Sequence, residues 1–154
     1  MPAIPASRFI VEDRAPDDIS GPAHALWIGE VAGLTQFGAF VEVLEPGARS
    51  ALKHWHEAED ELVLVLEGEV TLVEGNDATL LRAGDGAAFK AGVPVGHCLE
   101  NRSDRPTRCL VIGTRARVDR IVYPDHDRIC HRDRSRPEDV WTDLAGNPAT
   151  SPYG

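Results

Sequence analysis

The chain has 154 residues, of which 42% are apolar and 27% are charged, a composition that is typical of a globular domain and excludes disordered, fibrous and membrane-spanning classes. A domain of this length folds without disulfides or a structural metal, so any metal site is expected to serve function first. The 25 acidic against 16 basic residues give a net charge of −9, which argues against nucleic acid or an anionic membrane surface as a partner.

The amino-terminal residues contain no basic stretch followed by an apolar run, and no segment approaches the roughly 18 apolar residues of a membrane span. We therefore expect a cytoplasmic protein. The cysteines Cys98, Cys109 and Cys130 are odd in number and form no CxxC pair, so we expect reduced thiols rather than a disulfide framework or a thiolate zinc site.

Residues 1–33 are predicted to form an N-terminal arm that packs on the domain, because the stretch 12–22 is polar and contains Pro and Gly. Residues 34–123 break into short apolar runs separated by Gly, Pro, Asn and Asp, which is typical of antiparallel strands. The predicted strands are 37–44, 61–66, 70–73, 78–81, 95–100, 108–114 and 119–123. Because no helical period appears, the pattern favours an all-β sandwich, barrel or jelly roll.

Residues 124–154 mix charges of both signs with Pro, and they are predicted to form an extended C-terminal arm rather than a domain. Trp27 and Trp141 are the side chains through which we expect the two arms to pack. Histidines outside the central region, which are His24, His126 and His131, are expected to be surface residues.

Both faces of the predicted strand 61–66 are apolar, because Leu62, Leu64 and Leu66 alternate with Val63 and Val65. A barrel interior covers only one of these faces. A second sheet, a terminal segment or a second subunit must cover the other face, and we favour a homodimer.

Two histidines separated by one residue carry the clearest chemical signal. His54 and His56 project to the same side of a strand, whereas Trp55 faces away. Four residues separate His56 from Glu61, which is enough for a tight loop that returns a carboxylate to the imidazoles on a neighbouring strand. His97 follows a Gly-containing turn and offers a fourth ligand. Imidazole and carboxylate groups together are typical ligands of a divalent metal.

These residues resemble the motifs of the cupin superfamily. The run Pro46-Gly47, His54-x-His56-x4-Glu61-x6-Gly68 is similar to the first cupin motif, and the stretch from Gly84-Asp85 to His97-x3-Asn101 is similar to the second. The resemblance covers residues 34–123. The chain is most similar to small single-domain cupins of the conserved-barrel type, some of which are assigned as sugar-phosphate isomerases. The resemblance implies a cupin double-stranded β-helix barrel and a metal held by His54, His56, Glu61 and His97.

The chain departs from this pattern at two places. Six residues rather than the usual five separate Gly47 from His54. In the second motif Lys90 stands where the family has proline, and the loop from Gly92 to His97 is two residues longer than usual. Lys90 is therefore one candidate substrate contact, and the other three candidates are Gln36, Phe40 and Phe89.

The resemblance implies one divalent ion, and the ligand types permit Fe, Mn, Zn, Ni, Co or Cu. The leading interpretation is a small-molecule enzyme, of isomerase or dioxygenase type, whose substrate chelates the metal. The alternative is a non-enzymatic cupin that binds a small ligand or senses a metal. No further general base is evident, and the acidic loop residues Glu57, Glu59 and Asp60 are expected to be solvated.

Overall fold

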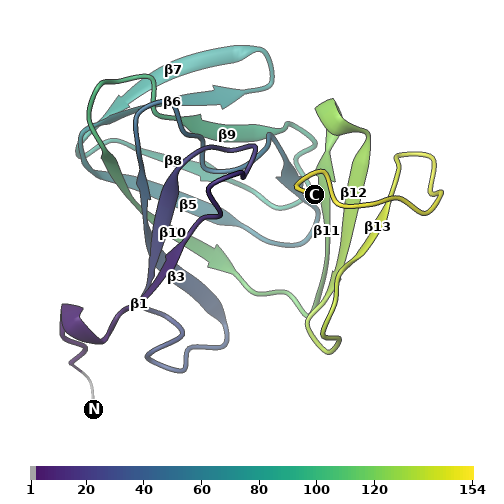
Figure 1. The fold of residues 1–154 in the computed structure, drawn as a ribbon. Helices are drawn as coiled ribbons and strands as arrows, with labels where there is room; N and C mark the ends of the chain where they lie inside the picture. The colour runs from purple at the N-terminus through teal and green to yellow at the C-terminus, as the bar shows by residue number, and fades with distance from the viewer. Residues whose placement is uncertain (1–2) are drawn as a thin grey trace.

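The regular structure of residues 3–154, which this computed structural model describes, is almost entirely β-strand (Figure 1). One sheet has the order β1-β2-β3-β10-β5-β8, a second β13-β12-β11-β4 and a third β7-β6-β9. The strands of the first sheet are β1 (Ile10–Asp13), β2 (Ala23–Trp27), β3 (Phe37–Leu44), β10 (Thr107–Thr114), β5 (Glu61–Glu67) and β8 (Gly86–Phe89). Those of the second are β13 (Val140–Thr142), β12 (Arg128–Asp133), β11 (Val118–Tyr123) and β4 (Trp55–His56), and those of the third are β7 (Asp77–Arg82), β6 (Glu69–Glu74) and β9 (His97–Glu100).

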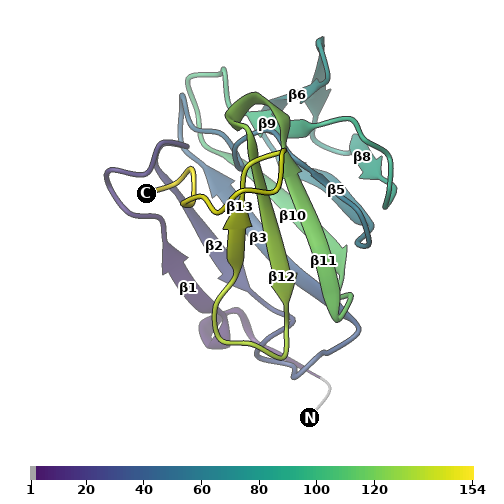
Figure 2. The ribbon, with the colours of Figure 1, turned by 90° about the vertical axis from the view of Figure 1, so that its right-hand side faces the viewer.

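The helical elements of the described residues are two short 3-10 turns, η1 (Ala6–Arg8) and η2 (Pro124–His126). No helix in this part of the chain is long and apolar enough to cross a membrane. The all-β jelly-roll prediction is confirmed. The view in Figure 2 shows the β11 to β13 sheet lying across β2, β3 and β10 as a separate layer.

The core lies between the sheets and is built from alternate residues of the long strands. Val63 and Val65 of β5 point inward and are each 1% exposed. They pack with Leu44 of β3 and with Leu72 and Leu99 from the third sheet. Gly68, with a φ of +79°, turns the chain between β5 and β6, where an added Cβ would lie 3.1 Å from the Pro106 carbonyl oxygen. Strand alternation therefore fixes which side chains face the interior.

The terminal segments are parts of the sheets rather than extended arms. β2 pairs antiparallel with β3, and β1 pairs with β2, so residues 10–27 extend the six-stranded sheet. At the other end, β12 pairs with both β11 and β13. The expected aromatic packing is present: Trp27 lies 4.5 Å from Phe40 and Trp141 lies 5.6 Å from Tyr123, measured between ring centroids.

One end of the second sheet is held to the barrel by a tyrosine. The Tyr153 hydroxyl accepts a hydrogen bond from the Leu52 backbone N–H at 3.1 Å, and its ring packs on that of Tyr123. Leu52 is 1% exposed and forms a small second core with Ile121 and Cys130. This contact places the C-terminal segment against the loop that leads into β4.

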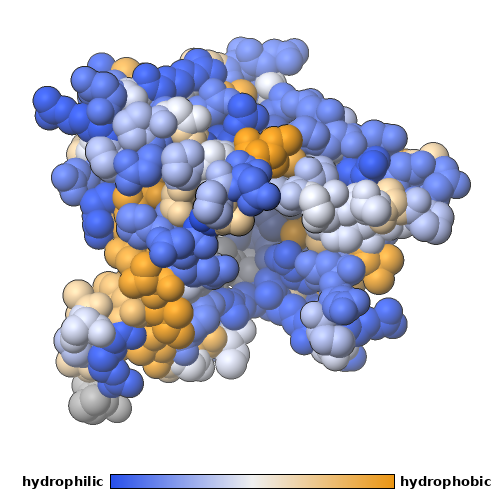
Figure 3. Space-filling view, in the orientation of Figure 1, coloured by the Kyte–Doolittle hydropathy of each residue, from blue (hydrophilic) through white to orange (hydrophobic). Residues whose placement is uncertain are grey.

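The outward face of the six-stranded sheet is apolar and partly exposed. Leu62, Leu64 and Leu66 of β5 are 48%, 38% and 45% exposed. The register places Leu62 beside Ile112 and Leu64 beside Leu110 on β10. Apolar side chains continue across the same face through Val41, Leu26 and Val11. Figure 3 also shows an apolar area over the position that β1 and β3 occupy in Figure 1.

We propose that a second copy of the chain covers this face, because a flat apolar sheet face is self-complementary across a two-fold axis and packs well on an identical sheet. Light scattering at micromolar concentration should return twice the chain mass of 16.7 kDa. Leu64→Glu places a charge at the centre of this face and should weaken association by at least about tenfold. Val118→Glu, at a residue 57% exposed on β11, is the control and should leave the dimer intact. A monomeric wild-type chain would contradict the proposal.

Candidate metal centre

The structure brings the four sequence-predicted ligands to one place in the barrel. His54 precedes β4, His56 ends it, Glu61 begins β5 and His97 begins β9. His54 and His97 form an antiparallel bridge in which the His54 N–H donates to the His97 carbonyl at 3.1 Å and the His97 N–H donates back at 2.9 Å. The two imidazoles therefore start from directly opposed main-chain positions.

The side chains of these residues converge closely. One potential ligand atom from each of His54, His56 and Glu61 lies within 4.8 Å of the others. His97 Nε2 lies 3.7 Å from Glu61 Oε1, and the His54 ring centroid lies 5.1 Å from those of both other histidines. The loop between His56 and Glu61 brings the carboxylate to the imidazoles as predicted, although β4 and β5 lie in different sheets rather than on neighbouring strands. Three imidazoles and one carboxylate thus share a single cavity.

Two of the imidazoles are oriented by acceptors behind them. His54 Nδ1 lies 2.8 Å from the Leu52 carbonyl oxygen, and His56 Nδ1 lies 2.6 Å from Asp119 Oδ2. Because both partners are acceptors, each Nδ1 carries the hydrogen and each Nε2 keeps a free lone pair. The other Asp119 oxygen accepts the Ala58 N–H at 2.8 Å, which fixes the carboxylate. This is the arrangement that holds metal-binding histidines in place.

His97 supplies the test of whether a metal fits. It is 4% exposed, and neither of its ring nitrogens has a hydrogen-bond partner among residues 3–154. Its ring stacks on Phe89 with centroids 3.5 Å apart. A buried imidazole without a hydrogen bond is destabilising, and a metal ion held beside Glu61 would satisfy the ring nitrogen that faces it. The donor set and this unpartnered imidazole fit a divalent metal.

The charges of the cluster suit cation binding. Burial lowers the pKa of His54 to about 4, so this imidazole is neutral at physiological pH. Burial alone would raise the pKa of Glu61, but the neighbouring histidines hold it below its usual value. The cluster therefore presents a neutral imidazole at His54 and an ionised carboxylate at Glu61.

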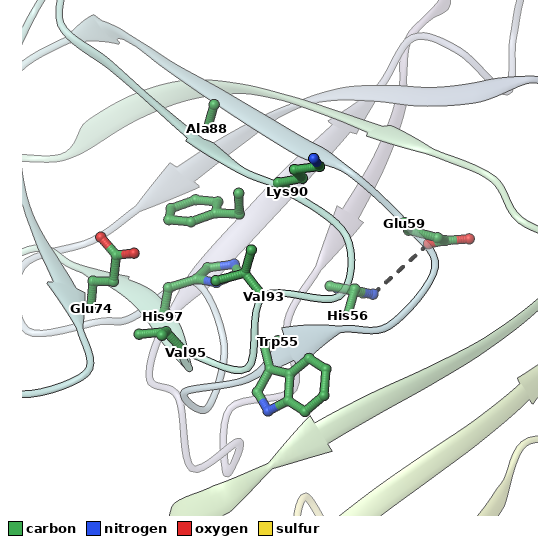
Figure 4. A pocket seen from close by; sticks show the side chains of 10 residues that line it. Trp55, His56, Glu59, Glu74, Ala88, Lys90, Val93, Val95 and His97 are labelled. Carbon is green, nitrogen blue, oxygen red and sulfur yellow. Dashed lines mark ion pairs between the residues drawn. The ribbon is translucent and has the colours of Figure 1, made fainter.

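Glu59 was expected to be solvated, and the structure corrects this. It is 7% exposed and accepts hydrogen bonds from Arg134 Nη2 at 2.7 Å and from the Ala116 N–H at 2.9 Å. It also lies 4.0 Å from His56 Nδ1, the ion pair drawn in Figure 4. The loop turns inward because Arg134 provides a positive partner for the Glu59 carboxylate. Glu59 thus joins Asp119 behind His56.

The four residues line a cavity of about 240 Å³ whose other polar lining includes Glu42 and Arg132. The predicted contacts Phe40 and Phe89 line it as well. Lys90 lines an adjoining pocket that reaches His56 and His97 from the side, with Glu74, Val93 and Val95 around it (Figure 4). Gln36 is exposed in the loop before β3 and lies outside this cavity. A hollow at the centre of Figure 3 lies between the main barrel and the second sheet.

Glu42 is an interior carboxyl that the sequence prediction missed. It lies on β3, where the register places it beside Cys109 and Ala25, and its Oε1 accepts a hydrogen bond from Arg14 Nη2 at 3.1 Å. Burial raises the pKa of Glu42 to about 7, because desolvation outweighs the attraction of Arg14. The available signal was a single acidic residue within the apolar run 40–44.

Comparisons with known proteins agree with this fold and geometry. Residues 40–113 match the family model of the cupin domain. The structure superposes on a sugar phosphate isomerase of the cupin superfamily from Silicibacter pomeroyi with a TM-score of 0.87 and 34% identity, covering 97% of this chain and 98% of the other. A provisionally assigned sugar phosphate isomerase from Acidithiobacillus ferrooxidans gives 0.79 and 29%, covering 94% and 92%.

A polyketide cyclase from Streptomyces resistomycificus shares the fold alone, with a TM-score of 0.60 and 19% identity over 74% of this chain and 79% of the other. No curated protein matches the sequence closely enough to count as a relative. The barrel and its inward-facing histidines define a cupin-type β-barrel protein. The chain belongs to the cupin superfamily.

The raised pKa of Glu42 predicts an unusual pH dependence of stability. Between its unfolded value of 4.5 and its folded value of about 7, the folded state holds the proton more tightly, so the unfolding free energy falls as pH rises. Glu42→Gln has no titrating carboxyl at this position and therefore does not lose unfolding free energy in this way. Relative to wild type, the variant should gain about 2–3 kcal/mol between pH 5 and pH 8 in denaturant titrations. Glu138→Gln, at an exposed loop residue, is the control, and an equal gain there would contradict the assignment.

Proposed function

We propose that the chain binds one divalent metal through His54, His56, Glu61 and His97 and acts on a small molecule that chelates this ion. The observation that carries the proposal is the unpartnered, buried His97 imidazole, which faces Glu61 beside two imidazoles whose Nε2 atoms are free. When bound, the ion would act as a Lewis acid toward oxygen donors of the ligand.

The protein's own groups prepare this site in two ways. Asp119 and the Leu52 carbonyl hold two imidazoles in fixed tautomers, so little reordering accompanies metal binding. Phe40 and Phe89 exclude water from the cavity wall. The ligand types suit Fe, Mn, Zn, Ni, Co or Cu, and selection among them depends on metal supply as well as geometry.

An anionic hydroxycarbonyl compound, such as a phosphorylated or acidic sugar, is the substrate class that we favour, and isomerisation is the favoured reaction. Arg132 supports this choice because it lines both the metal cavity and an adjoining pocket, where Arg115 and Arg134 also lie, paired with Glu30 and Glu59. Arg132 pairs with Asp139 at 3.1 Å near the surface, so a phosphate or carboxylate group can compete for this guanidinium. Support also comes from the 34% identity to a sugar phosphate isomerase.

Metal analysis tests whether the chain binds a divalent metal, a premise that the enzyme and ligand-binding interpretations share. Protein purified without chelators should contain about one divalent ion per chain, because three imidazoles and one carboxylate form a complete ligand set. His56→Ala should lose most of this metal by elemental analysis, whereas His126→Ala in η2 should retain it. Equal metal content in wild type and His56→Ala would contradict the proposal.

The reaction class is tested by incubating metal-loaded protein with sugar phosphates, keto acids and diols, with and without oxygen. We expect turnover without oxygen, accompanied by exchange of a carbon-bound hydrogen with deuterated solvent detected by NMR. Turnover that requires oxygen would contradict the isomerase assignment and indicate a dioxygenase. Binding without turnover would favour the ligand-binding or metal-sensing alternative. Loss of both activity and metal in His56→Ala ties the result to the site.

A further inference from the structure

Glu42 is a buried carboxyl with one oxygen committed and one free. Its residue is 8% exposed, and Oε1 accepts the hydrogen bond from Arg14. No hydrogen bond reaches Oε2 within residues 3–154. This oxygen is nevertheless not fully enclosed by protein atoms. Alternation along β3 points Glu42 to the same side as Phe40, which also lines the metal cavity, and opposite to Val41 and Val43. The free oxygen therefore faces the cavity space.

Arg14 has several partners besides Glu42. Arg14 Nη1 donates to the carbonyl oxygens of Ser20, Gly21 and Arg49 at 3.3, 3.0 and 2.7 Å. Nη2 donates to the Ser50 carbonyl at 2.8 Å as well as to Glu42. The guanidinium is thus held by backbone carbonyls from two loops and by the Glu42 carboxylate, whose second oxygen is left free by this pairing.

Two separate cavities meet at Glu42. One is the metal cavity, which it shares with His54 and Glu61. The other is a pocket against β1 and β2, lined also by Glu12, Asp13 and His24, that is more open to the surface. A carboxyl at this boundary can exchange a proton with solvent from the β1 side while a ligand fills the metal cavity.

The charged and titratable groups around Glu42 come from several elements. Arg14 contacts it from the segment after β1, and Cys109 lies beside it on β10. The other groups that line one of the two cavities are Glu12, Asp13, His24, His54, His56, Glu61, His97, Tyr123 and Arg132. With His54, His56, Glu61 and His97 committed to metal, Glu42 is the remaining carboxyl of the metal cavity. Burial keeps its pKa close to neutrality.

We propose that Glu42 is the proton-exchanging group of the cavity, an inference that rests on the proposed isomerase function. Its carboxylate removes a proton from the carbon next to the substrate carbonyl, so the C–H bond breaks, an O–H bond forms on Glu42 and the electron pair moves to the carbonyl oxygen. Glu42 then returns the proton to the neighbouring carbon, while a hydroxyl proton passes between the two oxygens. Aldose and ketose interconvert with no change in composition and no external oxidant.

Oxalate, a chelating dianion, provides a probe that requires no substrate. Its negative charge in the metal cavity should drive Glu42 to take up a proton. Titration calorimetry of nickel-loaded protein at pH 8, in buffers with different ionisation heats, measures this uptake. We expect a clear fractional uptake in wild type, loss of most of it in Glu42→Gln, and binding at least as tight in the variant because the competing negative charge is gone.

Matched variants separate titration from packing. Glu42→Asp keeps a titrating carboxyl and should retain uptake, and Glu12→Gln, in the β1-side pocket, should leave it unchanged. Absence of uptake in wild type, or equal uptake in Glu42→Gln, would overturn the role of Glu42 while leaving the metal site intact. Failure of the nickel-loaded protein to bind oxalate would instead refute the chelating site of the proposed function, and with it this inference.

Discussion

The reciprocal hydrogen bonds between His54 and His97 are the contact on which the site depends. They join the segment before β4 to the start of β9, and so connect the second sheet to the third through main-chain atoms. Main-chain pairing does not depend on which side chains follow, so it fixes the origin of both imidazoles before any ligand enters. The other groups then lie around this fixed pair: Asp119 from β11 orients the His56 ring, and Glu61 from β5 completes the cluster.

Sequence patterns predicted the features of the fold that depend on neighbouring residues in the chain. The alternation of Leu62, Val63 and Leu64 gave β5 and its two apolar faces correctly, and the His54-x-His56 spacing placed two imidazoles on one side. Strand β8, residues 86–89, was missed because Gly-Ala-Ala-Phe has little intrinsic strand preference and forms by pairing with β5. The terminal strands were missed because Pro, Gly and mixed charges lie around them, although each pairs with the strand next to it in the sequence.

The orienting carboxylates show where sequence reasoning stops. Asp119 lies in a strand where polar residues are ordinary, and only the pairing of β11 with β4 brings it to His56. Glu59 looked like a solvated loop residue until Arg134, far along the chain, supplied its partner. Several acidic residues of this acidic chain are therefore interior groups matched to particular cations or imidazoles. The net charge alone conveys nothing of this distribution.

The position of Tyr153 has a consequence for how order in the site is maintained. Its hydroxyl holds the Leu52 N–H, and the Leu52 carbonyl in turn orients His54. Chain segments open locally at a smaller free-energy cost than global unfolding, and terminal segments that pack through few contacts are among the first to do so. Local opening of residues 140–153 would therefore remove the Tyr153 contact from Leu52, the residue whose carbonyl orients His54, without unfolding of the barrel.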